Sequence, residues 1–451
     1  MIFLMYLAAF LFPLDNFPLM FGGGYKPIAV LIILIYVLVN FPKLFRMKYK
    51  RSECYILSFF VISILISAVQ CVTNGYRLDG LMDAIQSLVS GFVCYVGFKL
   101  FVQQNSKSEA QITKLFLWII RGYAVAVFVG LLEFIYIYVV PSGAVSDVIH
   151  LFVARSDFAT TERLHFSFSE PSYISLHTNL FLLPAVIILK KKGLLTRYHQ
   201  LIVLSFITLS LFSMSIRYFI DIIVFMIAYL FLTASAKILV KRIATFVVML
   251  AAIVTIVQLI FIQNVFHMSS DHYYRMASMI KNPDSSNSDL STQIRKTYTA
   301  IGFDSFYDHP LLGYGLGNFH YAYVRHYTSV DPSLLAKADE LKNARTVYNL
   351  VTYNMYARLS SEMGLSGFLL IVMVIYLMVS KRMRNFSLLM MFLTVYSQLQ
   401  FDSFALVQLF FWIAMIQSRY IAELHVGDAD HLLNRVKGKI KALRNHRIEP
   451  A

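Results

Sequence analysis

The sequence predicts an all-α membrane protein that crosses the bilayer many times. Of its 451 residues, 58% are hydrophobic and only 14% are charged, and the mean hydropathy is +0.63. This much apolar surface exceeds what a water-soluble core could bury. Apolar runs of about 17–25 residues recur between short basic clusters, and helices of that length cross a hydrocarbon layer about 30 Å thick. The alternation over about 10 residues that a membrane β-barrel requires is absent.

Basic residues set the expected topology. The net charge of +15 could suggest nucleic acid as a partner, but Lys and Arg gather at the ends of the apolar runs, where they mark cytoplasmic segments. We therefore expect no nucleic-acid binding. The predicted cytoplasmic clusters are Lys43 to Arg51, Lys107 with Lys114, Lys190 to Arg197, Lys237 to Arg242, Lys381 to Arg384, and the tail from Arg435 to Arg447.

Each interval between two cytoplasmic clusters must contain an even number of crossings, and the apolar runs supply about two each. The predicted helices lie near 1–20, 26–42, 54–72, 80–103, 115–140, 172–189, 199–216, 217–236, 243–263, 349–380, 386–400 and 403–420. This gives about 12 transmembrane helices, with 11 to 13 as the range, and both termini in the cytoplasm. The first run lacks a positive start and a small-residue cleavage site, so we expect a retained helix rather than a signal peptide.

The runs divide the chain into four parts. Residues 1–263 carry transmembrane helices 1–9 with a short outer loop at 141–171, 264–348 form a large outer loop, 349–420 carry helices 10–12, and 421–451 form a basic cytoplasmic tail. A loop of about 85 residues without structure of its own would be unusual, so we expect short helices in it. No internal repeat is evident, which disfavours the common transporter plans.

Arg217 is the charged residue least expected inside an apolar run, where a charge costs a few kcal/mol and marks a functional site by default. It lies in "LSLFSMSIRYFIDIIVF" between two cytoplasmic clusters, which places it at the outer mouth of a helical hairpin. Asp221 follows four residues later and is expected to pair with it. A snorkelling or helix-capping arginine is the alternative interpretation.

The stretch "ERLHFSFSEPSYIS" at the end of the shorter outer loop carries Arg163 and Glu170. Pro171 suits the first turn of a helix, and Glu170 would lie near its positive end, either as a cap or as a functional carboxylate. Two outward arginines form planar, permanent charges suited to phosphate oxygens. Three other carboxylates are expected to be hydrogen-bonding groups between helices: Asp83, Glu133 and Asp402.

The large outer loop contains "DHPLLGYGLGNFHYAY", with glycines at positions 313, 315 and 317. The spacing matches neither a Walker loop nor the G-x-G-x-x-G fingerprint, and nucleotides are implausible on an outer face. Glycines permit tight turns and close approach of the backbone. The aromatic residues in and after the run could serve as platforms for sugars; they are Tyr314, Phe319, Tyr321 and Tyr323.

We predict no metal site and no cofactor. Cys54, Cys71 and Cys94 lack the spacing of metal ligands and are expected to be small buried hydrophobic residues. Asp428 and Asp430 form the only Asp-x-Asp in a polar stretch, and in a cytoplasmic tail they are expected to be solvated charges.

Four segments together resemble the O-antigen polymerase and O-antigen ligase superfamily, over about residues 160 to 370. They are "RLHFSFSEPSYIS", "LFSMSIRYF", "HPLLGYGLGNF" and "YNMYARLSSEMGLSG". The resemblance implies an all-helical membrane glycosyltransferase of the GT-C type in the bacterial inner membrane. Such an enzyme takes glycans from undecaprenyl pyrophosphate at the periplasmic face and needs neither nucleotide nor metal.

The resemblance also implies roles for single residues. Arg163 and Arg217 match the arginines that hold pyrophosphate, and Arg295 in "STQIRKTYTAIGF" matches a further loop arginine. The glycine turn of the family is matched by Gly313, Gly315 and Gly317, with Tyr314 among them.

The ligase branch usually has His-Asn where this chain has Tyr353 and Asn354, with the histidine thought to be catalytic. This departure favours a polymerase and leaves the general base unassigned. Our candidates are Glu170 first and His309 second, while Glu362 is expected to serve in helix packing.

The expected reaction joins repeat units carried on undecaprenyl pyrophosphate, and the expected partners are these donors, membrane lipids and a separate chain-length regulator. The alternatives are a ligase that transfers the polymer to lipid A core and a transporter of lipid-linked oligosaccharides. A transporter would need charges through the full membrane depth, whereas the strongest candidates here gather at the outer face.

Overall fold

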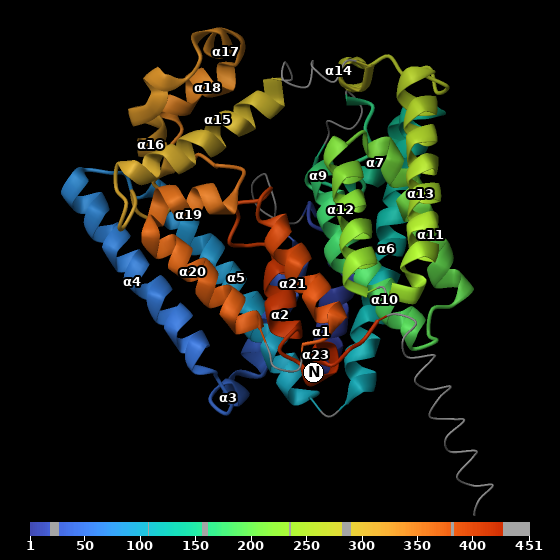
Figure 1. The fold of residues 1–451 in the computed structure, drawn as a ribbon, viewed down its shortest axis with the longest axis horizontal. Coiled ribbons are helices and arrows are strands. Elements are labelled where there is room, and N and C mark those ends of the chain that lie inside the picture. Colours follow the sequence, from blue (N-terminus) through green and yellow to red (C-terminus); the bar gives the residue numbers. More distant parts are fainter. Residues whose placement is uncertain are drawn as a thin grey trace, which may run out of the picture.

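The computed structural model describes residues 1–18, 27–106, 108–155, 161–233, 236–281, 290–379 and 383–426. These residues form helices joined by turns, and no β-strand occurs among them, which confirms the predicted all-α class. Figure 1 shows the N-terminus, α3 (Phe41–Leu44) and α23 (Arg419–Ala422) at the lower end of the helical bundle. Four helices from the large loop lie at the upper end: α15 (Leu290–Asp304), α16 (Phe319–His326), α17 (Pro332–Lys337) and α18 (Asp339–Asn343).

Six helical segments of the described chain are long and apolar enough to cross a membrane. They are α4 (Arg51–Asn74), α5 (Asp79–Gln104), α6 (Glu109–Tyr138), Pro171–Lys191 built from α9 (Pro171–His177), η1 (Thr178–Leu182) and α10 (Leu183–Lys191), α12 (Ile216–Thr233), and Ile243–Ile262 within α13 (Ala236–Val257) and η3 (Gln258–Ile262). Three shorter apolar helices accompany them: α2 (Ile28–Val39), α20 (Leu365–Met378) and α21 (Asn385–Ser397). The chain is therefore a polytopic membrane protein, and the number of about 12 crossings stays a prediction.

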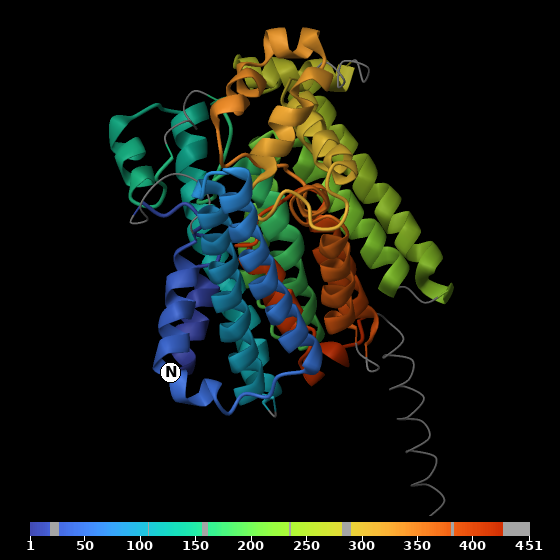
Figure 2. The same cartoon turned by 90° about the vertical axis from the view of Figure 1, so that its left-hand side faces the viewer.

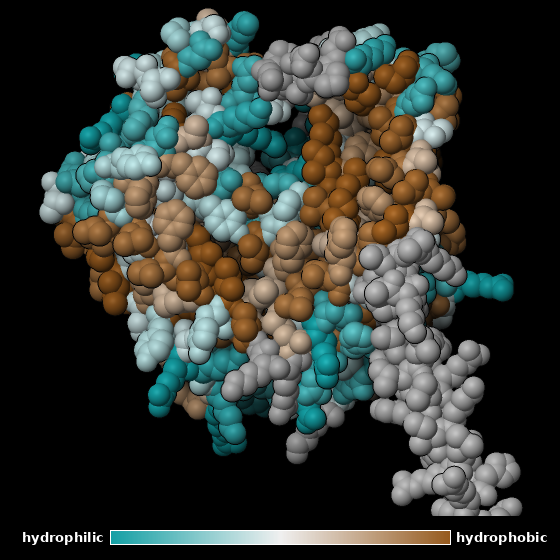
Figure 3. Space-filling view, viewed as in Figure 1, coloured by the Kyte–Doolittle hydropathy of each residue, from teal (hydrophilic) through white to brown (hydrophobic). Residues whose placement is uncertain are grey.

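The surface agrees with a bundle that sits across a bilayer. Figure 3 shows a brown hydrophobic band across the middle of one face, with teal hydrophilic residues above and below it. In Figure 2, α12 and α13 (green) lean away from the other helices at their lower ends. Within Ile243–Ile262, which spans α13 and η3, only 11% of the most apolar stretch of 18 residues is buried inside the protein. Most of this segment therefore faces the surroundings of the protein.

The first predicted helix, 1–20, is much shorter in the structure. Helix α1 covers Ile2–Phe10, and Pro13 follows, whose ring cannot continue the hydrogen-bond ladder. The chain then turns inward, where the Ser167 hydroxyl donates to the Pro13 carbonyl at 2.6 Å and the Ser169 amide donates to Asp15 Oδ1 at 2.5 Å. A helix of nine residues rises about 13.5 Å, less than half of the hydrocarbon layer.

The predicted single helix 349–380 is wrong, because two helices occupy its range. Helix α19 covers Met355–Met363 and α20 begins at Leu365, with Gly364 between them at φ +58°. A Cβ on Gly364 would lie 2.6 Å from the Pro310 carbonyl oxygen, so the glycine lets the large loop approach the break.

The last two predicted helices are also shorter than expected. Helix α21 ends at Ser397 and α22 covers Val407–Met415, so a segment at 398–406 joins them without regular structure. Non-helical backbone at membrane depth is tolerated where protein buries it or where it lines a water-filled space. The polar residues Gln398, Gln400, Asp402 and Ser403 in this segment suit the second case.

The large loop contains α14 (Asp271–Lys281) and the helices α15 to α18. Helices α15 to α18 share a buried cluster in which Tyr298, Phe319 and Tyr323 are fully buried, whereas α14 packs on the main core. Its placement outside the cytoplasm stays a prediction.

Several predicted features lie outside the described residues: Lys107, Lys381, Arg382, the Asp428–Asp430 pair and the basic tail beyond 426. The side chains of residues 236–242, including three basic ones, are also not described.

Candidate active site

A polar cavity of about 460 Å³ lies where the large loop meets α5, α9 (Pro171–His177), α12 and the segment 398–406. Figure 3 shows a hollow between α15 and α12, just above the hydrophobic band. Of the residues predicted for the site, five line this cavity: Glu170, Arg217, Arg295, Gly317 and Tyr353.

Arg217 enters the cavity from the first turn of α12. A tight turn precedes it, with Met214 at φ +47°, so the chain reverses at the top of the predicted hairpin. The side chain is only 14% exposed, its Nε lies 3.7 Å from Asp221 Oδ2, and its guanidinium stacks 3.8 Å above the Phe401 ring. Nε and Nη2 make no hydrogen bond within the described chain. Buried donors without partners are costly, so this side chain is suited to an anion in the cavity.

Asp221 is fixed by other groups than Arg217. Its Oδ1 accepts hydrogen bonds from the Tyr396 hydroxyl at 2.8 Å and from Gln400 Nε2 at 2.9 Å. Only Oδ2 faces Arg217, which confirms the predicted pairing at a spacing of four residues. The carboxylate therefore orients the arginine without occupying its donors.

Arg295 reaches the same cavity from α15, with its guanidinium 5.1 Å from the centre of the Tyr353 ring. Tyr353 adopts φ +58° at the end of a non-helical stretch before α19. Burial, reinforced by the charge of Glu340, raises the pKa of Tyr353 to about 12. At neutral pH the phenol keeps its proton and can donate a hydrogen bond, but it cannot act as a base.

Asn354, the neighbour of Tyr353, has a local structural role. Its Oδ1 accepts the backbone N–H groups of Tyr356 at 2.9 Å and Ala357 at 3.1 Å, and so caps the N-terminus of α19. It does not line the cavity. Tyr353 therefore belongs to the cavity, whereas Asn354 stabilises the start of α19.

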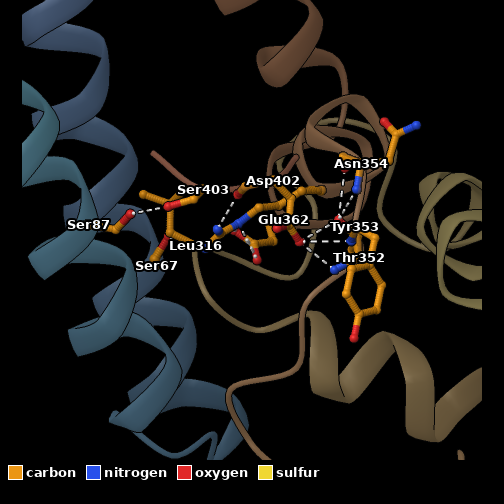
Figure 4. Close-up of polar contacts among 10 residues, drawn as sticks. Ser67, Ser87, Leu316, Thr352, Tyr353, Asn354, Glu362, Asp402 and Ser403 are labelled. Atoms are coloured by element: carbon orange, nitrogen blue, oxygen red, sulfur yellow. Dashed lines mark hydrogen bonds and ion pairs between the residues drawn. The ribbon is translucent and has the colours of Figure 1, made fainter. Parts of the chain in front are cut away.

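Asp402 connects the segment 398–406 to the stretch before α19. Its Oδ2 accepts the backbone N–H groups of Thr352 at 2.6 Å and Tyr353 at 3.0 Å, and the Thr352 hydroxyl at 3.1 Å. Figure 4 shows Asp402 facing Thr352 and Tyr353 on one side of the group, while Ser87 faces Ser403 on the other. The predicted role of Asp402 as a hydrogen-bonding group agrees with these contacts.

Arg358 on α19 is a third arginine that lines the cavity, and sequence reasoning missed it. Its Nε lies 3.1 Å from both carboxylate oxygens of Glu362, and its Nη1 donates to the Asp402 carbonyl at 2.6 Å. Its position in a predicted apolar helix was the same signal that identified Arg217. Glu362, expected to serve in packing, is the ionic partner of this arginine.

The glycine turn attaches the large loop to α19 and α4. Gly313, Gly315 and Gly317 have φ of +64°, +92° and +75°, a region that favours glycine. The backbone N–H of Gly315 donates to the Glu362 carbonyl at 2.9 Å, and that of Leu316 donates to the Ser67 hydroxyl on α4 at 2.7 Å.

Contacts between glycines bring the same turn against α5. A Cβ on Gly80 would lie 2.0 Å from the Gly317 carbonyl oxygen, and a Cβ on Gly317 would lie 2.0 Å from that of Gly80. The glycine turn therefore brings α4, α5, α19 and the large loop together. Among Gly313, Gly315 and Gly317, only Gly317 lines the cavity.

Other predicted site residues lie outside the cavity lining. Arg163 donates from Nε to the Ser213 carbonyl at 3.0 Å, and so contacts the turn from which Arg217 follows. His309 is exposed and its ring meets the Tyr314 ring edge-on, with centres 4.6 Å apart. The Tyr314 hydroxyl donates to Asp308 Oδ2 at 2.8 Å.

Glu170 does line the cavity, at the position that precedes α9. It makes no side-chain capping hydrogen bond to that helix, and its Oε2 accepts the Ser172 hydroxyl at 3.1 Å instead. The carboxylate is exposed toward the polar space.

A second cavity, of about 440 Å³, adjoins the first and is lined mainly by apolar side chains of α4, α5, α20 and α22. Met355 and Leu359 on α19 face it, whereas Arg358 on the same helix lines the polar cavity. Phe404 also lines it, and the Arg358 guanidinium stacks 4.7 Å from the centre of that ring. The Arg358–Phe404 contact therefore joins the lining of the polar cavity to that of the apolar cavity.

The fold and the cavity define a polytopic helical membrane protein with an arginine-lined polar site at one end of its bundle. Residues 201–372 match the family model described as O-antigen ligase, and this range contains Arg217, Arg295, the glycine turn and Tyr353. The match confirms the resemblance to the O-antigen polymerase and ligase superfamily, and it supports a glycosyl-transferring enzyme of O-antigen assembly without distinguishing the two branches. No curated protein matches the chain. Among the described residues, no cluster of three or more His, Cys, Asp or Glu side chains could hold a metal ion.

Proposed function

We propose that the protein is an O-antigen polymerase, or the polymerase of a related surface polysaccharide, in the bacterial inner membrane. It joins repeat units carried on undecaprenyl pyrophosphate at the periplasmic face and releases undecaprenyl pyrophosphate. The observation that carries the proposal is Arg217, a buried guanidinium beside a cavity that Arg295 also lines. Two of its nitrogens have no hydrogen-bond partner among the residues that the structure describes. Fixed guanidiniums of this kind recognise phosphate oxygens by paired, charge-assisted hydrogen bonds.

In the proposed reaction an acceptor hydroxyl attacks the anomeric carbon of the donor sugar. The bond from that carbon to the diphosphate oxygen breaks, and the electron pair leaves with the diphosphate. Negative charge grows on this leaving group, so guanidiniums already in place stabilise the transition state more than the ground state. The proposal includes no nucleotide and no metal.

The apolar cavity supports a lipid-linked donor. An isoprenoid chain in that cavity would gain about 0.8 kcal/mol for each buried CH₂ group. Its diphosphate would then lie past the Arg358–Phe404 contact, in the polar cavity with the three arginines. The two cavities together suit an amphipathic molecule with an anionic head.

Tyr353 supports the polymerase over the ligase as the particular activity. The resemblance places a catalytic histidine at this position in ligases, and a phenol with a pKa of about 12 cannot replace it as a base. Transfer of the finished polymer to lipid A core remains the alternative within the family. A transporter of lipid-linked oligosaccharides is less well supported, because the arginines of the cavity gather at one end of the bundle.

The orientation belongs to the proposal as well. Both termini would face the cytoplasm and the large loop the periplasm, where a chain-length regulator could contact it. Labelling of single cysteines placed in 264–348 from outside intact spheroplasts tests this orientation.

The purified protein in lipid nanodiscs, supplied with a lipid-linked repeat unit, tests the activity. A ladder of product lengths supports the polymerase. Transfer only to added lipid A core identifies a ligase, and the absence of any product with either acceptor overturns the proposed enzyme.

A further inference from the structure

We infer that Asp83 on α5 is a catalytic residue that takes the proton from the acceptor hydroxyl; this inference rests on the proposed function. Three carboxylates line the polar cavity among the described residues: Asp83, Glu170 and Asp402. They differ in the hydrogen bonds that their oxygens already accept. They also differ in the side of the cavity from which they enter it.

Asp402 already has a structural role. One of its oxygens accepts three hydrogen bonds from Thr352 and Tyr353, which fix the stretch before α19. Oδ2 therefore already serves to hold the backbone before α19 in place, and the structure gives Asp402 a positioning role.

Glu170 lies on the wall of the cavity that carries Arg217. It immediately precedes α9, and α9 packs on α12, the helix that carries Arg217. Its charge also acts on Tyr353, whose ring faces the Arg295 guanidinium. A leaving diphosphate bound by Arg217 and Arg295 would therefore occupy the space beside Glu170.

Asp83 reaches the cavity from a different wall. Helix α5 packs on α2, α4 and α22, whereas α12 packs on α9, α13 and α21. Gly80, Asp83 and Ser87 follow one another at helical spacing on the face that lines the cavity. Figure 1 shows α5 and α12 on the two sides of α21.

The Asp83 carboxylate is exposed, and within the described chain it has no hydrogen bond and no ion pair. One turn earlier, Asp79 is paired with Arg77 at 2.8 Å. Ser87, one turn later, contacts Ser403 at 3.5 Å. The charge of Asp83 acts on Arg358, which lies on the same side of the cavity as the 403–404 segment.

The direction of attack at the anomeric carbon decides which of the two carboxylates, Asp83 or Glu170, faces the acceptor hydroxyl. Displacement at the anomeric carbon proceeds in line, so the acceptor oxygen approaches from the side opposite the leaving diphosphate. With the diphosphate at Arg217 and Arg295, the acceptor hydroxyl lies toward α5. Asp83 accepts the hydroxyl proton, the new carbon–oxygen bond forms, the bond to diphosphate breaks, and exposed Asp83 later returns the proton to water. One in-line step inverts the anomeric configuration.

The test compares Asp83→Asn with Asp79→Asn, which makes the same chemical change one turn away, in nanodiscs with a purified lipid-linked repeat unit. We expect Asp83→Asn to lower the rate of chain growth by about 100-fold or more, because a positioned base contributes about 10²–10⁴-fold. Asp79→Asn should keep a near wild-type rate. Both variants should be stabilised against heat by undecaprenyl pyrophosphate to the same extent as the wild type.

Wild-type chain growth by Asp83→Asn overturns the inference, and so does a loss of diphosphate binding that matches the loss of rate. Should that variant fail to fold, the configuration of the linkage formed by the wild type gives an independent answer, since retention contradicts the two-wall geometry. A wild-type protein that makes no product at all refutes the proposed function. A wild type that makes inverted product while Asp83→Asn is equally fast refutes only the role of Asp83.

Discussion

Gly80 and Gly317 meet backbone against backbone, each at the position where the other would carry a Cβ atom, with 2.0 Å to the opposing carbonyl oxygen. Gly80 belongs to the first turn of α5 and Gly317 to the glycine turn of the large loop, and both line the polar cavity. This contact fixes how closely the loop lies over α5.

Gly317→Ala should therefore separate the loop from α5 and reduce chain growth strongly. An alanine at φ +75° costs about 1–2 kcal/mol before the clash with Gly80 is counted. Gly143→Ala is the matched control, because a Cβ there meets nothing within 4 Å. Thermal unfolding and ladder formation measured on both variants check the prediction, and equal values for the two would refute it.

Arg217→Ala should abolish ladder formation while membrane insertion stays intact, because the variant lacks the guanidinium that has free donors beside the cavity. Arg217→Lys should restore little, since an ammonium lacks the planar fork of donors that matches phosphate. Arg419→Ala, at an exposed arginine that pairs with Glu423 at the other end of the bundle, serves as control. An unchanged ladder in Arg217→Ala would remove this residue from the site.

Ile64→Trp should fill part of the apolar cavity from α4 and weaken the donor's binding. Displacing two or more CH₂ groups of the chain removes about 0.8 kcal/mol each, so we expect KM for the lipid-linked donor to rise about tenfold or more. The turnover of bound donor should change little. Val72→Trp adds the same bulk to an outward position of the same helix, 81% exposed, and should leave KM unaltered. Equal KM values for the two variants would show that the chain lies elsewhere.

The large loop should lose stability as the pH falls below about 6.5. Burial lowers the pKa of His320 and outweighs the opposing effect of the nearby Val347 and Ala344 backbone. The unfolded chain then takes up a proton that the folded loop resists, so stability is present above the ordinary histidine pKa and declines below it. His320→Gln should show a smaller drop in melting temperature between pH 7 and 5.5. A drop as large as that of the wild type would assign the effect to another group.

The stability of the large loop should fall a second time at lower pH. Burial raises the pKa of Asp308, but hydrogen bonds from Tyr314 and His326 outweigh it and leave the pKa below its usual value. The carboxylate therefore stabilises the folded loop above about pH 4 and ceases to do so as the pH falls further. Asp308→Asn should remove this acid-side decline in the same melting experiment.

Periodicity and charge were enough to predict the helical membrane class, because long apolar runs have few other stable forms. They could not predict where helices stop within the membrane. At Gly364 the large loop packs closely against the break, and past Ser397 the Gln398 and Phe401 carbonyls accept the backbone N–H of Met355. Such long-range contacts are not encoded in any local pattern.

The site shows the same division. Arg217 stood out because a lone charge in an apolar run is rare, and the cavity contains it. Arg358 carries the same signal, but Glu362 four residues later makes it look like an ordinary ion pair of a helix. Asp83 was expected to bond between helices, and only the three-dimensional arrangement places it in the cavity, with no partner in the described part of the chain.

The stacking of Arg358 on Phe404 couples the linings of the two cavities mechanically. Phe404 lines the apolar cavity and Arg358 lines the polar cavity. A hydrocarbon chain that moved the Phe404 ring would therefore also move the guanidinium stacked on it. Under the proposed function, binding of the donor's hydrocarbon chain would therefore change the position of a positive charge beside its diphosphate.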